Sequence, residues 1–224
     1  MNLSAYKTFV FDCDGVLLNS NKIKTEAFRR ISLRFGKEVS DNFVKYHIDN
    51  GGVSRYKKIQ YLLDVLNSKK IKNKFIIEGS KSENFLLNEF ASLVINGLLD
   101  CEVANGLKEL RSKFSNSSWI IVSGSDQKEL RSVFAKRKLS HYFDAGIFGS
   151  PVSKIDHLTK LIRKNVVQKP AIFFGDSKLD FEVANASNMD FIFVKKWTEL
   201  HNWEEVFKDE DITHIETLSD LLKI

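Results

Sequence analysis

The chain has 224 residues, of which 43% are hydrophobic and 28% charged, and its net charge is +5. This length and balance allow one or two domains with a real hydrophobic core and exclude a disordered chain. No apolar run is long enough to span a bilayer, and the first residues lack a secretory signal, so we expect a cytoplasmic protein without a membrane partner. Only Cys13 and Cys101 are present, which fits a reducing compartment.

The positive charge is spread along the chain. Its densest patch, Lys69, Lys70, Lys72 and Lys74, alternates with apolar and polar residues and predicts a solvated helix face. No zinc-finger spacing or aromatic RNA-binding motif accompanies this patch, so no nucleic-acid partner is expected. The five histidines show no paired metal-ligand spacing, which argues against a zinc site.

The first predicted strand, residues 6–11, ends in two carboxylates, Asp12 and Asp14. Ligands of open α/β sheets bind beyond the carboxyl ends of the strands. Two carboxylates so close together are costly to bury unless a cation or a substrate needs them. Asp14-Gly15 is also a common turn pair, so this segment alone leaves a purely structural role open.

Residues 19–96 show no convincing strand, and their apolar residues recur at helical spacing. We therefore predict a helical domain at residues 19–96 that is inserted into a core formed by residues 1–18 and 97–224. Asn96-Gly97 marks a plausible return hinge at the end of the insert.

Strands and helices alternate through the rest of the chain. Further strands are predicted at residues 118–122, 145–148, 171–174 and 191–194, and helices at residues 104–115, 126–138, 154–165 and 180–187. This alternation predicts an α/β fold, a Rossmann-like doubly wound parallel sheet with helices on both faces.

Three further polar segments follow the later strands. Ser123-Gly124-Ser125 precedes a helix, where a hydroxyl and free backbone N–H groups suit a phosphate. Lys154 opens a helix, where its charge is unfavourable unless an anion lies nearby. Asp176 and Asp180 follow the fourth strand. Each segment by itself is also explained as a helix cap or a surface lysine.

In combination, FVFDCDGV, IIVSGS, Lys154 and FFGDSKLD resemble the four motifs of the haloacid dehalogenase superfamily. The resemblance covers residues 7–16 and about 100–195. The helical insert after the first motif resembles the all-helical cap of the branch that holds phosphoglycolate phosphatase and β-phosphoglucomutase. The resemblance therefore implies a Rossmann-like catalytic core, at residues 1–18 and 97–224, with a helical cap at residues 19–96.

The resemblance also implies the chemistry of the acidic residues. Asp12 would be the nucleophile and a Mg²⁺ ligand, and Asp176 the second carboxylate ligand. Two carboxylates fit Mg²⁺, which keeps several of its waters. Asp14 would act as general acid and then as general base, with its backbone carbonyl on the metal. The acid step needs a proton, so we expect the surroundings of Asp14 to raise its pKa.

The remaining motif residues would handle the phosphoryl group. The resemblance implies that Ser123 and the Gly124 N–H hold it and that Lys154 neutralises both the phosphoryl group and Asp12. Asp180 would support Lys154 or a metal-bound water. Mg²⁺ and Lys154 together remove the repulsion between a phosphate dianion and a carboxylate nucleophile.

Arg55 and Lys24 are the candidate specificity residues of the cap. Arg55 ends a GVSR segment that resembles the one whose arginine grips the distal phosphate in β-phosphoglucomutase. A helix capped by Ser54, with a solvated Arg55, explains the segment equally well. Lys24 stands where that enzyme carries a histidine that serves mutase gating, which favours simple hydrolysis.

We therefore predict a Mg²⁺-dependent phosphatase that acts on a small phosphorylated metabolite through an aspartyl phosphate on Asp12. A phosphosugar mutase and a catalytically silent binding subunit are the alternatives. The joint presence of Asp12, Asp14, Lys154 and Asp176 argues against a silent subunit. The sequence leaves the natural substrate and the oligomeric state open.

Overall fold

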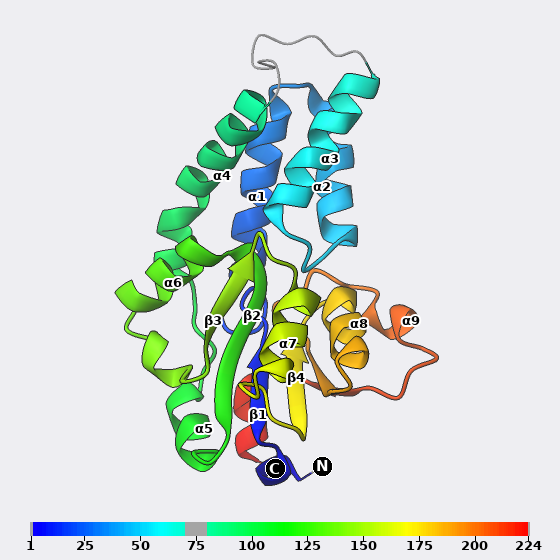
Figure 1. Cartoon of the computed structure of the whole chain (residues 1–224). Coiled ribbons are helices and arrows are strands. Elements are labelled where there is room, and N and C mark those ends of the chain that lie inside the picture. Colours follow the sequence, from blue (N-terminus) through cyan, green and yellow to red (C-terminus); the bar gives the residue numbers. More distant parts are fainter. Residues whose placement is uncertain (1, 70–79, 224) are drawn as a thin grey trace.

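The computed structural model describes residues 2–69 and 80–223, in which a helical insert stands over one end of a parallel sheet (Figure 1). Both chain ends lie at the other end of the molecule. Lys70, Lys72 and Lys74 of the predicted basic helix face are outside the described residues.

One parallel sheet holds six strands in the order β3-β2-β1-β4-β5-β6. They are β1 (Thr8–Phe11), β2 (Ser118–Asp126), β3 (Gly146–Ser150), β4 (Ala171–Gly175), β5 (Asp190–Val194) and β6 (Thr213–Ile215). The first five match the predicted strands. The sequence analysis missed β6, because this strand has three residues and only Ile215 is buried, so it forms no apolar run.

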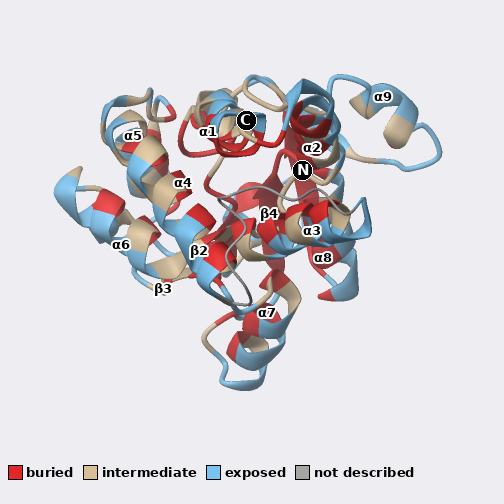
Figure 2. Cartoon of the chain, turned by 90° about the horizontal axis from the view of Figure 1, so that it is seen from above, coloured by how far each residue is buried: buried red, intermediate tan, exposed pale blue. Residues whose placement is uncertain are grey.

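Helices cover both faces of the sheet, which confirms the doubly wound fold. One face carries α5 (Leu107–Lys113) and α6 (Gln127–Lys136), and the other carries α7 (Lys154–Arg163), α8 (Lys178–Ala186) and α9 (Trp203–Val206). Short 3₁₀ turns are η1 (Leu3–Ala5), η2 (Ser140–Tyr142) and η3 (Leu218–Leu222). Successive side chains of β1 point to opposite faces of the sheet. Phe9 and Phe11 belong to the apolar cluster on one face, and Val10 belongs to the cluster on the other face. Figure 2 shows the sheet as buried and the outer helix faces as exposed.

The described part of the insert contains four helices, α1 (Asn21–Leu33), α2 (Lys37–Asp49), α3 (Arg55–Ser68) and α4 (Ser80–Asp100). The hinge expected at Asn96-Gly97 is wrong, because α4 continues through both residues. Gly97 is explained by packing instead, since a Cβ there would lie 2.9 Å from Cγ2 of Ile23 on α1. The proposed core boundary at residue 97 therefore falls inside α4, and the division into two domains otherwise stays a prediction.

The insert shares its core with the sheet. Phe28 and Phe90 of the insert belong to the same buried apolar cluster as Phe9 and Phe11 of β1. This continuity holds the insert against the carboxyl ends of the strands. Among the described helices, none combines the length and the apolar character that crossing a bilayer requires.

Gly97→Val should lower the free energy of unfolding by about 1–3 kcal/mol, because the new side chain overpacks the contact between α1 and α4. Denaturant unfolding measures the change. Asn96→Val is the matched control, since Asn96 is exposed on the same helix and its replacement should change stability by at most about 0.5 kcal/mol. Equal stability of the two variants would contradict the packing role of Gly97.

Candidate active site

A pocket of about 310 Å³ lies between the carboxyl ends of the strands and the insert. Six of the predicted site residues line it: Asp12, Asp14, Gly124 and Asp176 from the core, and Lys24 and Arg55 from the insert. Lys154 and Asp180 do not line the pocket, but Lys154 contacts both Asp12 and Asp180, and Ser123 is buried next to Gly124 in the chain. The structure therefore brings all nine predicted residues to one region.

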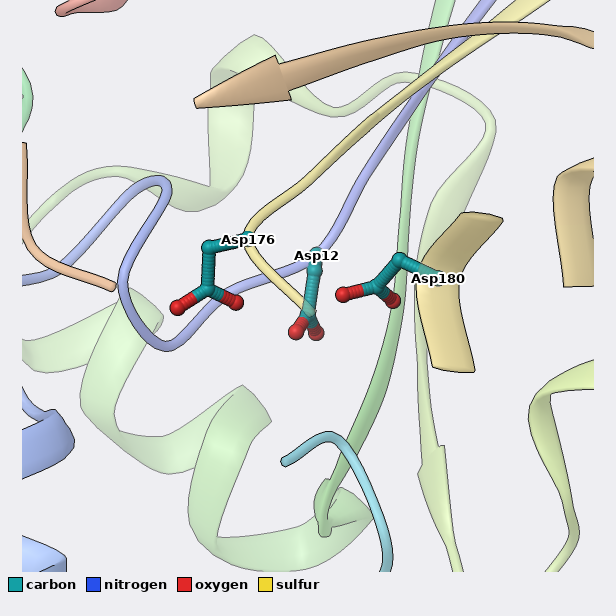
Figure 3. A group of neighbouring side chains, drawn as sticks. All are labelled: Asp12, Asp176 and Asp180. Carbon is teal, nitrogen blue, oxygen red and sulfur yellow. The ribbon is translucent and has the colours of Figure 1, made fainter. Parts of the chain in front are cut away.

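The order of the strands explains why Asp12 and Asp176 meet. Asp12 follows β1 and Asp176 follows the adjacent strand β4, and the Asp12 N–H still donates to the Phe174 carbonyl at 2.9 Å. One carboxylate oxygen from each of Asp12, Asp176 and Asp180 falls within a 4.8 Å cluster (Figure 3). Gly15 has φ +77°, and a Cβ there would lie 2.0 Å from Asp176 Oδ2. Only glycine at this position leaves room for that carboxylate.

This acidic cluster fits a bound cation. Oδ1 of Asp12 is buried and has no hydrogen-bond partner among the described residues. Burial raises the pKa of Asp12 to about 7 despite the charge of Lys154, and burial together with Asp12 raises the pKa of Asp176 well above its usual value. The charge of Lys154 therefore does not offset the burial of these two carboxylates, and a divalent cation between them would supply the missing positive charge. Two carboxylates leave room for the waters that Mg²⁺ retains.

Asp180 has its oxygens occupied by other partners. Oδ1 accepts from Lys154, and Oδ2 accepts from the Ser177 hydroxyl at 2.6 Å. Asp180 is therefore better suited to support Lys154 than to ligate a metal. The hydroxyl of Ser177 also caps α8 by accepting from the Asp180 N–H at 3.3 Å, which fixes this carboxylate in the first turn of the helix.

Lys154 is the first residue of α7, as predicted, and Ser153 caps that helix. The Nζ atom of Lys154 lies 3.0 Å from Oδ2 of Asp12 and also contacts Asp180. Burial opposes its charge, but these two carboxylates outweigh burial and raise the pKa of Lys154. The lysine is therefore a permanent cation against the nucleophile candidate.

The surroundings of Asp14 differ from the expectation. Oδ2 of Asp14 pairs with the ammonium of Lys24 and accepts from Ser125, while Oδ1 accepts from Ser20. Burial alone raises the pKa of Asp14, but the charge of Lys24 and these hydroxyl donors lower it to about 2. The expected rise of this pKa is therefore wrong for this structure, and Asp14 is ionised.

The phosphate-binding candidates lie in the irregular end of β2. The strand runs to Asp126 with a register shift after Val122, and Asp126 caps α6 by accepting from the Glu129 N–H at 2.8 Å. Ser123 and Gly124 therefore belong to the strand end and not to the first turn of the helix. A Cβ on Gly124 would lie 2.2 Å from the Gly52 carbonyl oxygen, so the insert loop packs directly on this segment.

Arg55 is not solvated, and that alternative is wrong. It is 6% exposed and forks onto Glu129 of α6, with Nη1 2.8 Å from Oε2. Its guanidinium also lies 4.7 Å from the Phe90 ring centre. Ser54 does cap α3, by accepting from the Lys57 N–H. Arg55 and Lys24 both line the pocket, but each already holds a carboxylate, and their role in specificity stays a prediction.

The sequence analysis missed the polar face of α1. Asn21 donates its amide Nδ2 to Asp176 at 2.7 Å, and Thr25 contacts both His47 and Glu199. Asn21, Lys24, Thr25 and Phe28 recur at helical spacing and share one helix face. The sequence signal that could have revealed this polar face is the spacing of its polar residues, which places them on the same side of the helix as Phe28.

Comparisons with known proteins agree with this geometry. Residues 9–194 match the family model described as haloacid dehalogenase-like hydrolase. A curated relative, the phosphorylated carbohydrates phosphatase of Thermotoga maritima, is 28% identical over 193 residues, which cover 82% of each chain.

Solved structures share the fold at lower identity. One, named as a predicted phosphoglycolate phosphatase from Haemophilus somnus, is 16% identical with a TM-score of 0.73 over 99% of each chain. Another, the β-phosphoglucomutase of Clostridium difficile, is 17% identical with a TM-score of 0.69 and covers 96% of this chain and 93% of its own.

Mg²⁺ should raise the melting temperature of the protein, because binding only to the folded state stabilises it by about 2.7 kcal/mol at one hundred times the dissociation constant. Asp176→Asn should remove most of this shift, since Asp176 supplies one of the two proposed ligands. Asp64→Asn, which removes the same charge from an exposed position on α3, should keep it. An equal Mg²⁺ shift in both variants would place the cation elsewhere.

Proposed function

We propose that this chain, which belongs to the haloacid dehalogenase-like hydrolases as its four motifs predicted, is a Mg²⁺-dependent phosphatase that acts through an aspartyl phosphate on Asp12. Its class as a phosphatase-type hydrolase follows from the family and from its curated relative. The observation that carries the mechanism is the buried Asp12, with Oδ1 unpartnered and Oδ2 held 3.0 Å from Lys154.

In the first step, a carboxylate oxygen of Asp12 attacks the phosphorus, and the bond to the leaving alcohol oxygen breaks. Mg²⁺ held by Asp12 and Asp176 would offset the repulsion between this carboxylate and the phosphate dianion. Lys154 stabilises the charge on the phosphoryl oxygens, and Ser123 and the Gly124 N–H position them. The departing alcohol takes its proton from Asp14 in its acid form.

In the second step, water attacks the same phosphorus and the bond to Asp12 breaks, which restores the carboxylate and releases phosphate. Asp14 accepts the proton that the water loses. The lowered pKa of Asp14 favours this base role, because Asp14 is ionised beside Lys24. Its acid role requires a proton at the start of the first step, and a substrate that weakened the pair with Lys24 would let Asp14 take this proton from solvent.

We propose a small phosphorylated metabolite as the substrate. The pocket volume of about 310 Å³ supports this size class. The name of the curated relative refers to phosphorylated carbohydrates, so sugar phosphates are among the first compounds to assay. Release of phosphate, rather than exchange of phosphoryl groups between hexose phosphates, distinguishes this function from that of a mutase.

Asp12→Asn should abolish turnover of p-nitrophenyl phosphate in the presence of Mg²⁺, with a loss of roughly 10⁴-fold or more, because the nucleophile is gone. Circular dichroism and the melting temperature show whether the variant is folded. Activity near that of the unmodified enzyme in a folded variant would rule out the covalent mechanism.

Lys24→Met should move the acidic limb of the pH–rate profile to higher pH. Lys24 is the main group that lowers the pKa of Asp14 to about 2, and its removal leaves burial, which raises that pKa. In this variant Asp14 becomes protonated at a higher pH than in the unmodified enzyme, and protonated Asp14 cannot act as the base. Lys22→Met removes the same charge from an exposed position on α1 and should leave the limb in place. Superimposable profiles for all three proteins would show that Asp14 does not set the acidic limb, which Asp12, with its pKa raised by burial to about 7, would then set.

A further inference from the structure

One cation of the pocket has no carboxylate partner. Four lysine or arginine side chains line the pocket, and three of them are paired. The pairs are Lys24 with Asp14, Arg55 with Glu129 and Lys178 with Glu182. Lys58 of α3 is 2% exposed, and no described carboxylate lies within 4.0 Å of its Nζ.

Lys58 is held in place by His47 of α2. Its Nζ lies 2.7 Å from Nδ1 of His47 and 3.1 Å from the His47 carbonyl oxygen. Nε2 of His47 lies 2.9 Å from the Thr25 hydroxyl, which donates to Glu199 at 2.8 Å. Burial and the charge of Lys58 lower the pKa of His47 well below its usual value, so the imidazole is neutral and accepts from the lysine. These contacts use two of the three N–H groups of the ammonium.

A buried ammonium without a counter-charge is unfavourable. Burial, with the nearby charge of Lys24, lowers the pKa of Lys58 to about 7. An anion that entered the pocket would favour the protonated form of Lys58. It would also accept a hydrogen bond from the remaining N–H of the ammonium. Among the described cations that line the pocket, Lys24 and Arg55 are held in buried ion pairs, and Lys178 is exposed to solvent beside Glu182. Lys58 is therefore the buried pocket cation that is left for an anion.

The place of Lys58 indicates which part of a substrate it meets. Asp12 and Asp176 lie at the sheet end of the pocket, whereas Lys58, His47 and Phe28 come from the insert. A site that binds only the phosphoryl group cannot distinguish one leaving group from another, so discrimination requires contacts with the remainder of the substrate.

We propose that Lys58, oriented by His47, binds a second acidic group on the part of the substrate that leaves as the alcohol. The substrate class is then a small phosphorylated hydroxy acid or a bisphosphate, and not a phosphate ester with a neutral remainder. This inference rests on the proposed phosphatase function. Arg55, the residue expected to take this role, instead joins the insert to α6 through Glu129.

The test compares kcat/KM for three probes of similar size: 2-phosphoglycolate, the bisphosphate of ethylene glycol, and ethyl phosphate, which has a neutral remainder. The unmodified enzyme should prefer at least one anionic probe over ethyl phosphate by about tenfold or more. Lys58→Met should reduce that preference by roughly 10–100-fold, the loss of one charged hydrogen bond. The anionic probe that loses its advantage identifies a carboxylate or a phosphate as the bound group.

Lys57→Met is the matched control, because Lys57 is the exposed neighbour on the same helix and its loss should leave the preference unchanged. Lys58→Arg should retain part of the preference, and Lys58→Gln replaces Lys58→Met if the latter does not fold. No preference in the unmodified enzyme, or an equal loss on all three probes in a folded Lys58 variant, would overturn the proposal.

The proposed function is tested separately by p-nitrophenyl phosphate turnover and its loss in Asp12→Asn. If that turnover is absent, calorimetric binding of 2-phosphoglycolate and of the bisphosphate in Mg²⁺ still tests Lys58. Binding weakened about tenfold or more by Lys58→Met, but not by Lys57→Met, supports the acidic-group site. Equal binding by the two variants overturns it.

Discussion

Buried negative charge at the carboxyl edge of the sheet is the constraint on which the site depends. Asp12, Asp176 and Asp180 are all buried there, and among the described residues Lys154 is the cation in direct contact with Asp12 and Asp180. A single ammonium cannot neutralise three carboxylates, so the protonation of Asp12 and Asp176 is favoured until another cation arrives. This shortage of positive charge is the physical reason why we propose that a divalent cation binds at the cluster.

The insert completes the site. Arg55 joins Glu129, and the Tyr56 hydroxyl donates to Asp126 at 2.6 Å, so the first turn of α3 is tied to the first turn of α6. The loop before α3 lies so close to the candidate phosphate-binding residue Gly124 that a side chain there would collide with the Gly52 carbonyl oxygen. Polar contacts of this kind can open when a ligand enters or leaves, whereas the shared apolar cluster keeps the insert on the sheet.

The two buried lysines of the pocket, Lys24 and Lys58, differ in their nearest partners. Lys24 is paired with Asp14 and lowers its pKa, which favours a role in the protonation of Asp14, while its role in specificity stays a prediction. Lys58 faces the same pocket with a neutral histidine beside it, which leaves its charge for a ligand. The two lysines are similarly buried, and the different roles that we propose for them follow from their different nearest partners.

Local patterns in the sequence determined five of the six described strands, most of the described helices, and the positions of Asp12, Asp176 and Lys154 at strand and helix ends. Such positions can be predicted because burial periodicity and capping act between residues close in the chain. Only the tertiary structure decided that Arg55 meets Glu129, that Lys24 lowers the pKa of Asp14, and that Lys58 lies on His47. These pairs join separate elements, and the pairing of a long charged side chain depends on which carboxylate the packing brings within reach, which no local pattern records.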